Sequence, residues 1–233
     1  MKKRIWELDA FRGICIIGVV IVHLIFDMVE LYRLIHWDYP EWFFFVKQWG
    51  GTVFLVLSGV CVTLGSRSVR RGAIVFCAGL LCTLVTFVMS RLGFDKYIII
   101  YFGVLHCLGV CMILWPLLKR LPWWALAAAG TVLAVVGLCI MDVRVESHWL
   151  VPLGFIYRGF ESSDYFPLLP NLGFFLMGAA IGKTAYRKKE SLLPRLESCP
   201  IFRPLCFCGR QSLWIYLLHQ PVLAGLCYLI SGG

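Results

Sequence analysis

Long apolar stretches separated by short polar connections run through the whole chain of 233 residues. The sequence is 60% hydrophobic and only 15% charged, which is more apolar than a water-soluble core requires. About 20 apolar residues in a helix cross the hydrocarbon of a bilayer. The stretches that approach this length cover residues 10–31, 43–66, 72–92, 97–118, 122–141, 166–183 and 207–230. The sequence therefore predicts an all-α fold, a polytopic bundle of about seven transmembrane helices that forms a single domain over residues 1–233.

The charged residues between these stretches predict the orientation. With the N-terminus in the cytoplasm, most basic residues lie inside: Lys2, Lys3, Arg4, Arg67, Arg70, Arg71, Lys119, Arg120, Lys183, Arg187, Lys188, Lys189, Arg195 and Arg203. Most acidic residues then lie in the outer connections: Glu30, Asp38, Glu41, Asp95, Asp142, Glu146, Glu161 and Asp164. Cytoplasmic loops carry such an excess of Lys and Arg. We therefore expect a cytoplasmic N-terminus in the plasma (bacterial inner) membrane, and the first span stays as an anchor because no small-residue cleavage site follows it.

The net charge of +9 follows from this asymmetry and indicates contact with anionic membrane lipid rather than with nucleic acid. Arg and Lys also bind phosphate groups, so the cytoplasmic face is suited to a phosphate-bearing donor as well. Among the 11 cysteines, Cys199, Cys206 and Cys208 cluster near a basic loop. They lack the paired Cys-x-x-Cys or histidine spacing of a zinc site, and no metal is expected.

The first apolar stretch carries the most informative polar residues. Ten residues, nearly all apolar, separate Arg12 from His23, so a helix places the two about 16 Å apart. This distance is around half the hydrocarbon thickness, and an imidazole at such depth usually faces a partner or a wet cavity. Asp27 lies one turn further on and is positioned to hold the imidazole tautomer. His23 is therefore a candidate catalytic base, with Asp27 as its orienting partner.

Two more histidines fall near the middle of predicted spans. His106 is flanked by Gly103 and Gly109, where close helix packing and a functional role are both open. His219 precedes Pro221, which frees a backbone carbonyl that polar side chains can satisfy, so a structural role is favoured for it. The same two histidines could instead ligate a b-type haem from two helices.

The connection after the first span carries candidates for contact with a substrate from outside. His36 lies just past the end of this span, flanked by Trp37 and Asp38, and Gln48 opens the second span. Aromatic rings beside carboxylates suit sugar recognition, and they equally suit an interfacial aromatic belt. We therefore treat Trp37, Asp38 and Gln48 as candidate substrate-binding residues and His36 as a second candidate base.

Several segments together resemble known membrane acyltransferases. They are residues 8–13 (LDAFRG), 54–59 (FLVLSG), 103–109 (GVLHCLG), 171–178 (NLGFFLMG) and 209–221 (GRQSLWIYLLHQP). An arginine and a histidine separated by ten residues form the signature of the acyltransferase-3 family, and Arg12 and His23 match it. The chain length and the order of the other segments are more similar to the heparan-α-glucosaminide N-acetyltransferase-like proteins.

The resemblance implies transfer of an acetyl or other acyl group from cytoplasmic acyl-CoA to an amine or hydroxyl of an extracytoplasmic sugar or glycan. It places the phosphates of acetyl-CoA near the inner face, and the candidate donor contacts are Arg12, Arg70, Arg71, Arg210 and His106. In this family the active histidine follows the first helix, so His36 is its counterpart by position. The choice between His23 and His36 as the base stays open, as does an acyl-histidine intermediate.

Two other classes of protein are compatible with such a sequence. A transporter or flippase for a small molecule or a lipid-linked sugar also needs polar residues at mid-depth, but it commonly carries inverted repeats and broken helices in matched halves. The sequence has neither feature. The second class is a membrane subunit without an activity of its own. Small-residue helix faces are also compatible with a homodimer.

Overall fold

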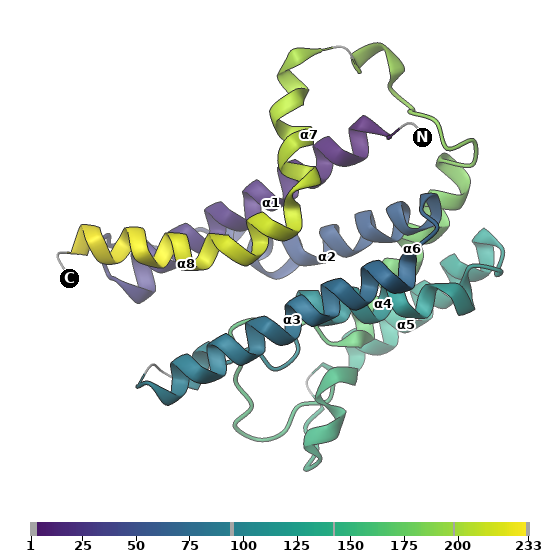
Figure 1. Cartoon of the computed structure of the whole chain (residues 1–233). Helices are drawn as coiled ribbons and strands as arrows, with labels where there is room; N and C mark the ends of the chain where they lie inside the picture. The colour runs from purple at the N-terminus through teal and green to yellow at the C-terminus, as the bar shows by residue number, and fades with distance from the viewer. Residues whose placement is uncertain (1–3, 94–95, 142, 198, 232–233) are drawn as a thin grey trace. The chain divides into compact units, whose positions relative to one another are not determined.

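The computed structural model describes residues 4–93, 96–141, 143–197 and 199–231, and these residues form helices without any strand (Figure 1). Lys2, Lys3, Asp95 and Asp142, which the sequence assigns to loops, lie outside the described residues. The chain divides into two compact units. Unit 1 comprises residues up to Phe54 together with those from Lys188 onward, and unit 2 comprises Leu55–Arg187.

Unit 1 is built around the first helix. Helix α1 (Trp6–Phe26) continues into a π-helical turn, η1 (Asp27–Leu31), and the first half of α2 (Glu41–Leu64) follows. Two short 3₁₀ turns, η4 (Pro194–Leu196) and η5 (Pro200–Phe202), lead into α7 (Arg203–Arg210) and α8 (Ser212–Ser231). Both α7 and α8 pack against α1 (Figure 1). Elements from opposite ends of the sequence therefore form one packed group.

Glycine makes the crossing of α1 and α7 possible. A Cβ atom added at Gly13 would overlap the carbonyl oxygen of Leu205, and one added at Gly209 would overlap that of Asp9. Small residues let two helix backbones approach this closely in an apolar environment. The first turn of α1 also holds the segment before α7, since Glu7 accepts hydrogen bonds from the Ser191 hydroxyl at 2.8 Å and from the Leu192 N–H at 2.7 Å.

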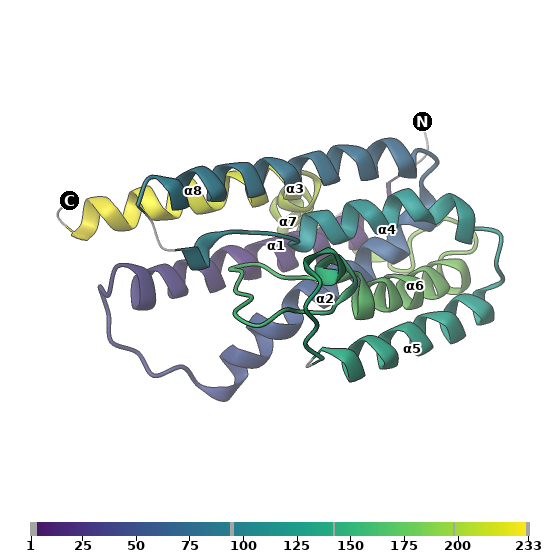
Figure 2. The ribbon, with the colours of Figure 1, turned by 90° about the horizontal axis from the view of Figure 1, so that it is seen from below.

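Unit 2 is a set of paired helices. It contains the second half of α2, α3 (Ser68–Arg91), η2 (Lys96–Ile98), α4 (Val104–Leu118), α5 (Trp123–Ile140), η3 (His148–Leu153) and α6 (Leu168–Ala185). Helix α3 packs on α4, α5 packs on α6, and α4 and α6 join the two pairs (Figure 2). Gly72 and Gly109 face each other between α3 and α4, as do Gly130 and Gly173 between α5 and α6. Leu126 and Phe175 are fully buried in this core.

The structure confirms the predicted fold class, an all-α polytopic bundle. Within the described residues, six helices are long and apolar enough to cross a membrane, namely α1 with η1, α2, α3, α5, α6 and α8. The fourth predicted stretch is a shorter helix: α4 begins at Val104, not at residue 97. Residues before it are held outside the helix because Phe102 pairs with Tyr165 and Asp164 accepts the Val104 N–H at 3.0 Å. Hydropathy alone cannot reveal such a tertiary cap.

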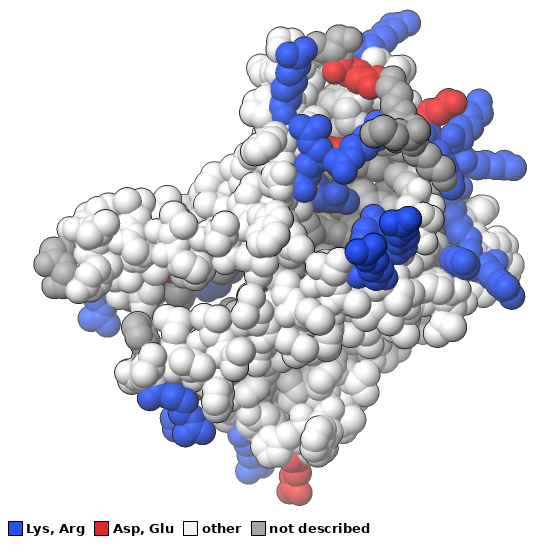
Figure 3. All heavy atoms as spheres, in the orientation of Figure 1, with Lys and Arg blue, Asp and Glu red and all other residues white. Residues whose placement is uncertain are grey.

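Helices α3 and α8 carry little charge along their length. Helix α8 has no Asp, Glu, Lys or Arg, and α3 has its charges at Arg70, Arg71 and Arg91, near its ends. The flanks of α3 and α8 that face the viewer in Figure 3 are accordingly uncharged. Large apolar side chains of these helices are exposed, for example Leu84 on α3 and Leu229 on α8. Surfaces of this kind suit contact with lipid.

The crossing of α1 and α7 predicts a sharp difference between two glycines of the same helix. Replacing Gly13 by Ala forces the α7 backbone away, and overpacking of this kind costs about 1–3 kcal/mol. A Cβ atom added at Gly18 would meet only open space, so Gly18→Ala should be neutral or stabilise the helix by up to about 1 kcal/mol. Thermal unfolding of the purified protein in detergent measures both. Equal midpoints for the two variants would contradict the tight crossing.

Candidate active site

Four polar side chains of unit 1 gather where the end of α1 meets α8. They are His23 on α1, Asp27 at the start of η1, and His219 and Gln220 on α8. The rings of His23 and His219 lie edge to face, with centroids 4.8 Å apart. Asp27 is completely buried and His219 is only 9% exposed. We call these four residues the α1–α8 polar cluster.

A hydrogen bond between Gln220 and Asp27 orders one half of the cluster. The Nε2 of Gln220 donates to Oδ1 and Oδ2 of Asp27 at 2.9 and 3.0 Å. Because a carboxylate only accepts hydrogen bonds, the amide nitrogen faces Asp27 and the amide oxygen faces away. This Oε1 is buried and has no hydrogen-bond partner among the described residues.

The expected pairing of Asp27 with His23 needs correction. Over the described part of the chain no hydrogen bond joins the two residues, and Asp27 binds Gln220 instead. The helix widens into a π-helical turn at Asp27, so the residue no longer follows the regular i, i+4 geometry on which the expectation relied. Gln220 is the hydrogen-bond partner of Asp27, and it lies next to His23. The sequence reasoning missed Gln220, although its place beside His219 and Pro221 was a usable signal.

His219 has one nitrogen engaged and one open. Its Nδ1 lies against the carbonyl oxygen of Tyr216, in the turn that precedes Pro221. A carbonyl oxygen can only accept, so Nδ1 carries the proton and Nε2 is left as an acceptor. Nε2 is buried and unpartnered within the described residues. The cluster therefore presents two buried acceptors beside His23.

The remaining candidates on the predicted outer side are not members of this cluster. His36, Trp37 and Asp38 are exposed on the loop between η1 and α2, and Gln48 is exposed on α2. The Trp37 ring packs with aromatic residues of the same region: Tyr39, Trp42 and Phe43. On the same helix as Gln48, Lys47 places its ammonium 4.7 Å from the centre of the Phe26 ring, near the end of α1.

Arg12 and Arg210 belong to the opposite end of unit 1. Arg12 approaches Asp9 at 3.8 Å, as does Arg4. Arg210 is exposed at the end of α7. Burial raises the pKa of the neighbouring Cys206 thiol and Asp9 adds to this rise, whereas Arg210 opposes it. Arg12 and Arg210 thus both lie near the Asp9 carboxylate, which offsets part of their positive charge.

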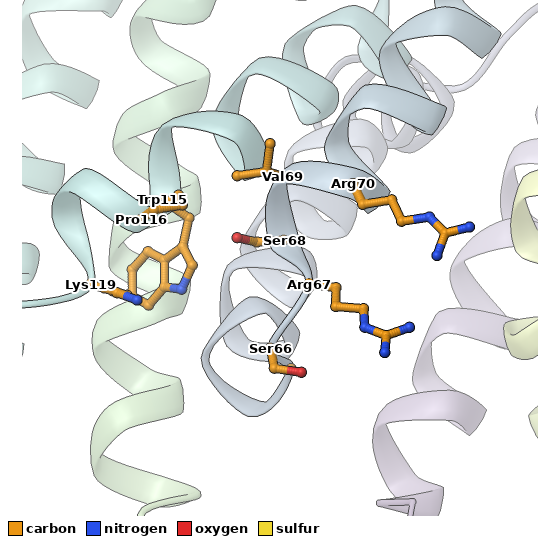
Figure 4. A pocket seen from close by; sticks show the side chains of 9 residues that line it. Ser66, Arg67, Ser68, Val69, Arg70, Trp115, Pro116 and Lys119 are labelled. Carbon is orange, nitrogen blue, oxygen red and sulfur yellow. The ribbon is translucent and has the colours of Figure 1, made fainter.

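Unit 2 contains a cavity of about 450 Å³ between the start of α3 and the end of α4. Its lining residues are Gly65, Ser66, Arg67, Ser68, Val69, Arg70, Trp115, Pro116 and Lys119. In Figure 4 Ser68 points toward Trp115 and Lys119, while the guanidinium groups of Arg67 and Arg70 extend together to the other side. Helix α3 begins without a side-chain cap or an acidic residue in its first turn. Its free N–H groups and these cations favour an anion.

The sequence predicts that both Arg70 and Arg71 contact the donor, but the two side chains lie in different places. Arg70 lines the cavity, whereas Arg71 is not part of the lining and lies against Gly65. Arg67, Trp115 and Lys119 were missed as site residues because the sequence does not reveal which loop ends share a cavity. Lys183 of α6 supports this end by donating to the carbonyl oxygens of Lys119, at 2.7 Å, and Leu121.

A second cavity, of about 470 Å³, lies in the connection between α5 and α6 of unit 2. Its lining residues are Arg144, Val145, Glu146, His148, Tyr157 and Arg158. The rings of His148 and Tyr157 stack edge to face at 4.2 Å. Tyr165 anchors the connection by donating to the Val151 carbonyl at 2.7 Å, and burial raises the pKa of its hydroxyl. Aromatic rings that are surrounded by charges of both signs suit a polar ligand such as a saccharide.

Comparison with known proteins identifies the family. The model of the family described as heparan-alpha-glucosaminide N-acetyltransferase, catalytic, matches residues 4–221. The chain belongs to this family. It is therefore an integral membrane protein of an acetyltransferase family, and the resemblance seen in the sequence is confirmed. No curated protein and no solved structure matches the chain.

The matched range includes the whole α1–α8 polar cluster, all of unit 2 and most of unit 1. It ends at Pro221, directly after His219 and Gln220. For a member of an acetyltransferase family, buried histidines without a full set of partners are candidates for proton transfer. Within the described residues no group of three His, Cys, Asp or Glu is arranged to hold a metal ion.

His106, which the sequence analysis names as a candidate donor contact, has both ring nitrogens engaged within unit 2. It is 2% exposed, and its Nδ1 accepts the Gly103 N–H at 3.2 Å. Its Nε2 lies 3.4 Å from the Thr83 hydroxyl, which itself donates to the Ile100 carbonyl at 2.6 Å. The ring also packs edge-on against Phe76. Nδ1 thus caps the start of α4 and Nε2 lies against Thr83 of α3, which favours a structural role for His106 over contact with acetyl-CoA or a haem iron.

This structural role of His106 predicts a loss of stability. His106→Ala removes a buried ring and the acceptor for Gly103, and we expect the free energy of unfolding to fall by about 2–5 kcal/mol. His106→Asn keeps an acceptor near Nδ1 and should lose clearly less. Unfolding in detergent measures both, with acetyl-CoA binding recorded on the folded fraction. Weaker binding with unchanged stability would instead return His106 to the donor site.

Proposed function

We propose that the protein transfers an acetyl group from acetyl-CoA to an amine or hydroxyl group of a sugar, with His23 as the general base. The observation that carries this proposal is the α1–α8 polar cluster, which surrounds His23 with buried, unpartnered acceptors inside the range matched by the family. Burying polar groups without partners is costly. A cluster of this kind is therefore better explained by a substrate than by packing.

The reaction proposed at His23 is a direct acyl transfer. The lone pair of the acceptor nitrogen or oxygen forms a bond to the thioester carbonyl carbon, while the C–S bond breaks and its electron pair stays on sulfur. His23 takes the proton of the acceptor and returns it to the leaving thiolate, so the base is regenerated. His36 remains the alternative base, and attack by an imidazole nitrogen on the thioester is the covalent variant.

The unit 2 cavity is the proposed site for the phosphates of acetyl-CoA. Arg67, Arg70 and Lys119 supply three cations around the uncapped start of α3. In the orientation that the positive-inside rule predicts, this end of unit 2 faces the cytoplasm, where acyl-CoA is made. Arg12 and Arg210 of unit 1 stay candidate donor contacts from the sequence, and the Asp9 carboxylate offsets part of their charge. Arg71 has the least support because it does not line the cavity.

The acceptor is proposed to approach from the extracytoplasmic side. Trp37, Asp38 and Gln48 are exposed on the predicted outer side of unit 1. The cavity around Tyr157 in unit 2 offers aromatic and charged groups on the same predicted side. A transporter is the competing class, and it would move its substrate without transferring an acetyl group.

Transfer of radiolabelled acetyl from acetyl-CoA to glucosamine by the purified protein tests the proposal. We expect the wild type to label the sugar and His23→Ala to lose about 10²–10⁴-fold in rate, the usual worth of a general base. His36→Ala serves as the matched comparison and should lose much less. Full activity of His23→Ala would refute its assignment, and label that never leaves CoA would refute the acetyltransferase.

The donor site predicts that Arg70→Gln weakens the binding of acetyl-CoA. An exposed arginine bound to phosphate contributes about 1.5 kcal/mol, so the KM for acetyl-CoA should rise about tenfold with little change in the KM for the sugar. Arg91→Gln, at the other end of α3 and against the Phe87 ring, is the control. An equal rise of the KM for acetyl-CoA in both variants would show a general effect of charge rather than a specific binding site.

A further inference from the structure

The α1–α8 polar cluster has a property that the general base alone does not use. The open atom of Gln220 is an oxygen because Asp27 holds the amide nitrogen. The open atom of His219 is an unprotonated nitrogen because the Tyr216 carbonyl holds the Nδ1 proton. Two independent contacts thus leave two acceptors, and both are buried without a partner in the described structure.

The polarity of these two atoms decides what they can bind. A thioester carbonyl or its oxyanion needs hydrogen-bond donors, so the pair cannot stabilise the donor end of the reaction. A primary amine or its ammonium form brings two or three N–H donors and satisfies both atoms at once, whereas a hydroxyl brings only one O–H. His23 stands beside the pair, 4.8 Å from His219 between ring centroids.

From this geometry we infer that His219 Nε2 and Gln220 Oε1 form the subsite that binds the nucleophilic amine of the acceptor next to His23. The inference rests on the proposed function and deepens it, because it selects an amine over a hydroxyl. His23 receives one proton of the ammonium form, and the two acceptors hold the two N–H groups that remain, so that the lone pair of the amine faces the thioester. Asp27 does not touch the acceptor in this scheme; it is a positioning residue that fixes the Gln220 amide.

The experiment compares acceptor and donor kinetics in variants that remove only the accepting atoms. His219→Phe keeps an aromatic ring and Gln220→Met keeps the chain length, and both should raise the KM for glucosamine about tenfold or more. The KM for acetyl-CoA should stay within about twofold, because two acceptor atoms cannot hydrogen-bond the thioester carbonyl. His219→Gln restores an acceptor near Nε2 and should recover part of the loss. Gln211→Met, an exposed glutamine between α7 and α8, is the matched control.

A second measurement does not depend on the variants folding. In wild-type protein with ¹⁵N-labelled histidine, addition of glucosamine should shift the Nε2 resonance of His219 while Nδ1 stays protonated. An unshifted Nε2 resonance would overturn the inference. So would an unchanged KM for glucosamine in His219→Phe and Gln220→Met, or a KM for acetyl-CoA that rises equally.

These outcomes separate the two proposals. A wild type that acetylates glucosamine while the variants keep the wild-type KM contradicts only the subsite. A wild type that binds acetyl-CoA and acetylates nothing contradicts the proposed function, and the subsite with it.

Discussion

The hydrogen bond from Gln220 to Asp27 is the contact on which the candidate site depends. It joins α8, near the C-terminus, to the end of α1, near the N-terminus, between two helices that are mostly apolar. A carboxylate in such a place is unfavourable without a partner, and the glutamine amide supplies one. The same bond sets which way the amide faces, so the polarity of the open acceptor follows from the partner of the carboxylate.

Close contacts between helices hold α1, α7 and α8 of unit 1 in the arrangement that this hydrogen bond requires. Helix α7 crosses α1 at Gly13 and Gly209, where no side chain separates the two backbones, and α8 follows α7 directly. In unit 2, glycines play the same part between paired helices, and His106 fixes the start of α4 through its ring nitrogens. Histidine thus serves two purposes in one chain. A histidine with both nitrogens bonded stabilises the fold, whereas one with an open, buried nitrogen is a candidate for chemistry.

Much of the architecture could be predicted from composition and spacing. Apolar stretches of about 20 residues give membrane helices because every backbone polar group in lipid must be bonded within its own helix. The family could be recognised from the segments around Arg12, His23 and His219, and the family match confirms it. The start of α4 was predicted seven residues too early, because its cap comes from Asp164 in a distant segment.

The sequence by itself determined the fold class and the family, and it singled out His23, since these follow from local hydropathy and from residue types at fixed spacing. Only the tertiary structure decided which polar groups meet. It paired Asp27 with Gln220 rather than with His23, and it enclosed His106 completely. It also left His219 with an open nitrogen. Such partnerships join residues up to 193 positions apart, and the direction of a hydrogen bond depends on the atom that lies opposite, which no one-dimensional pattern specifies.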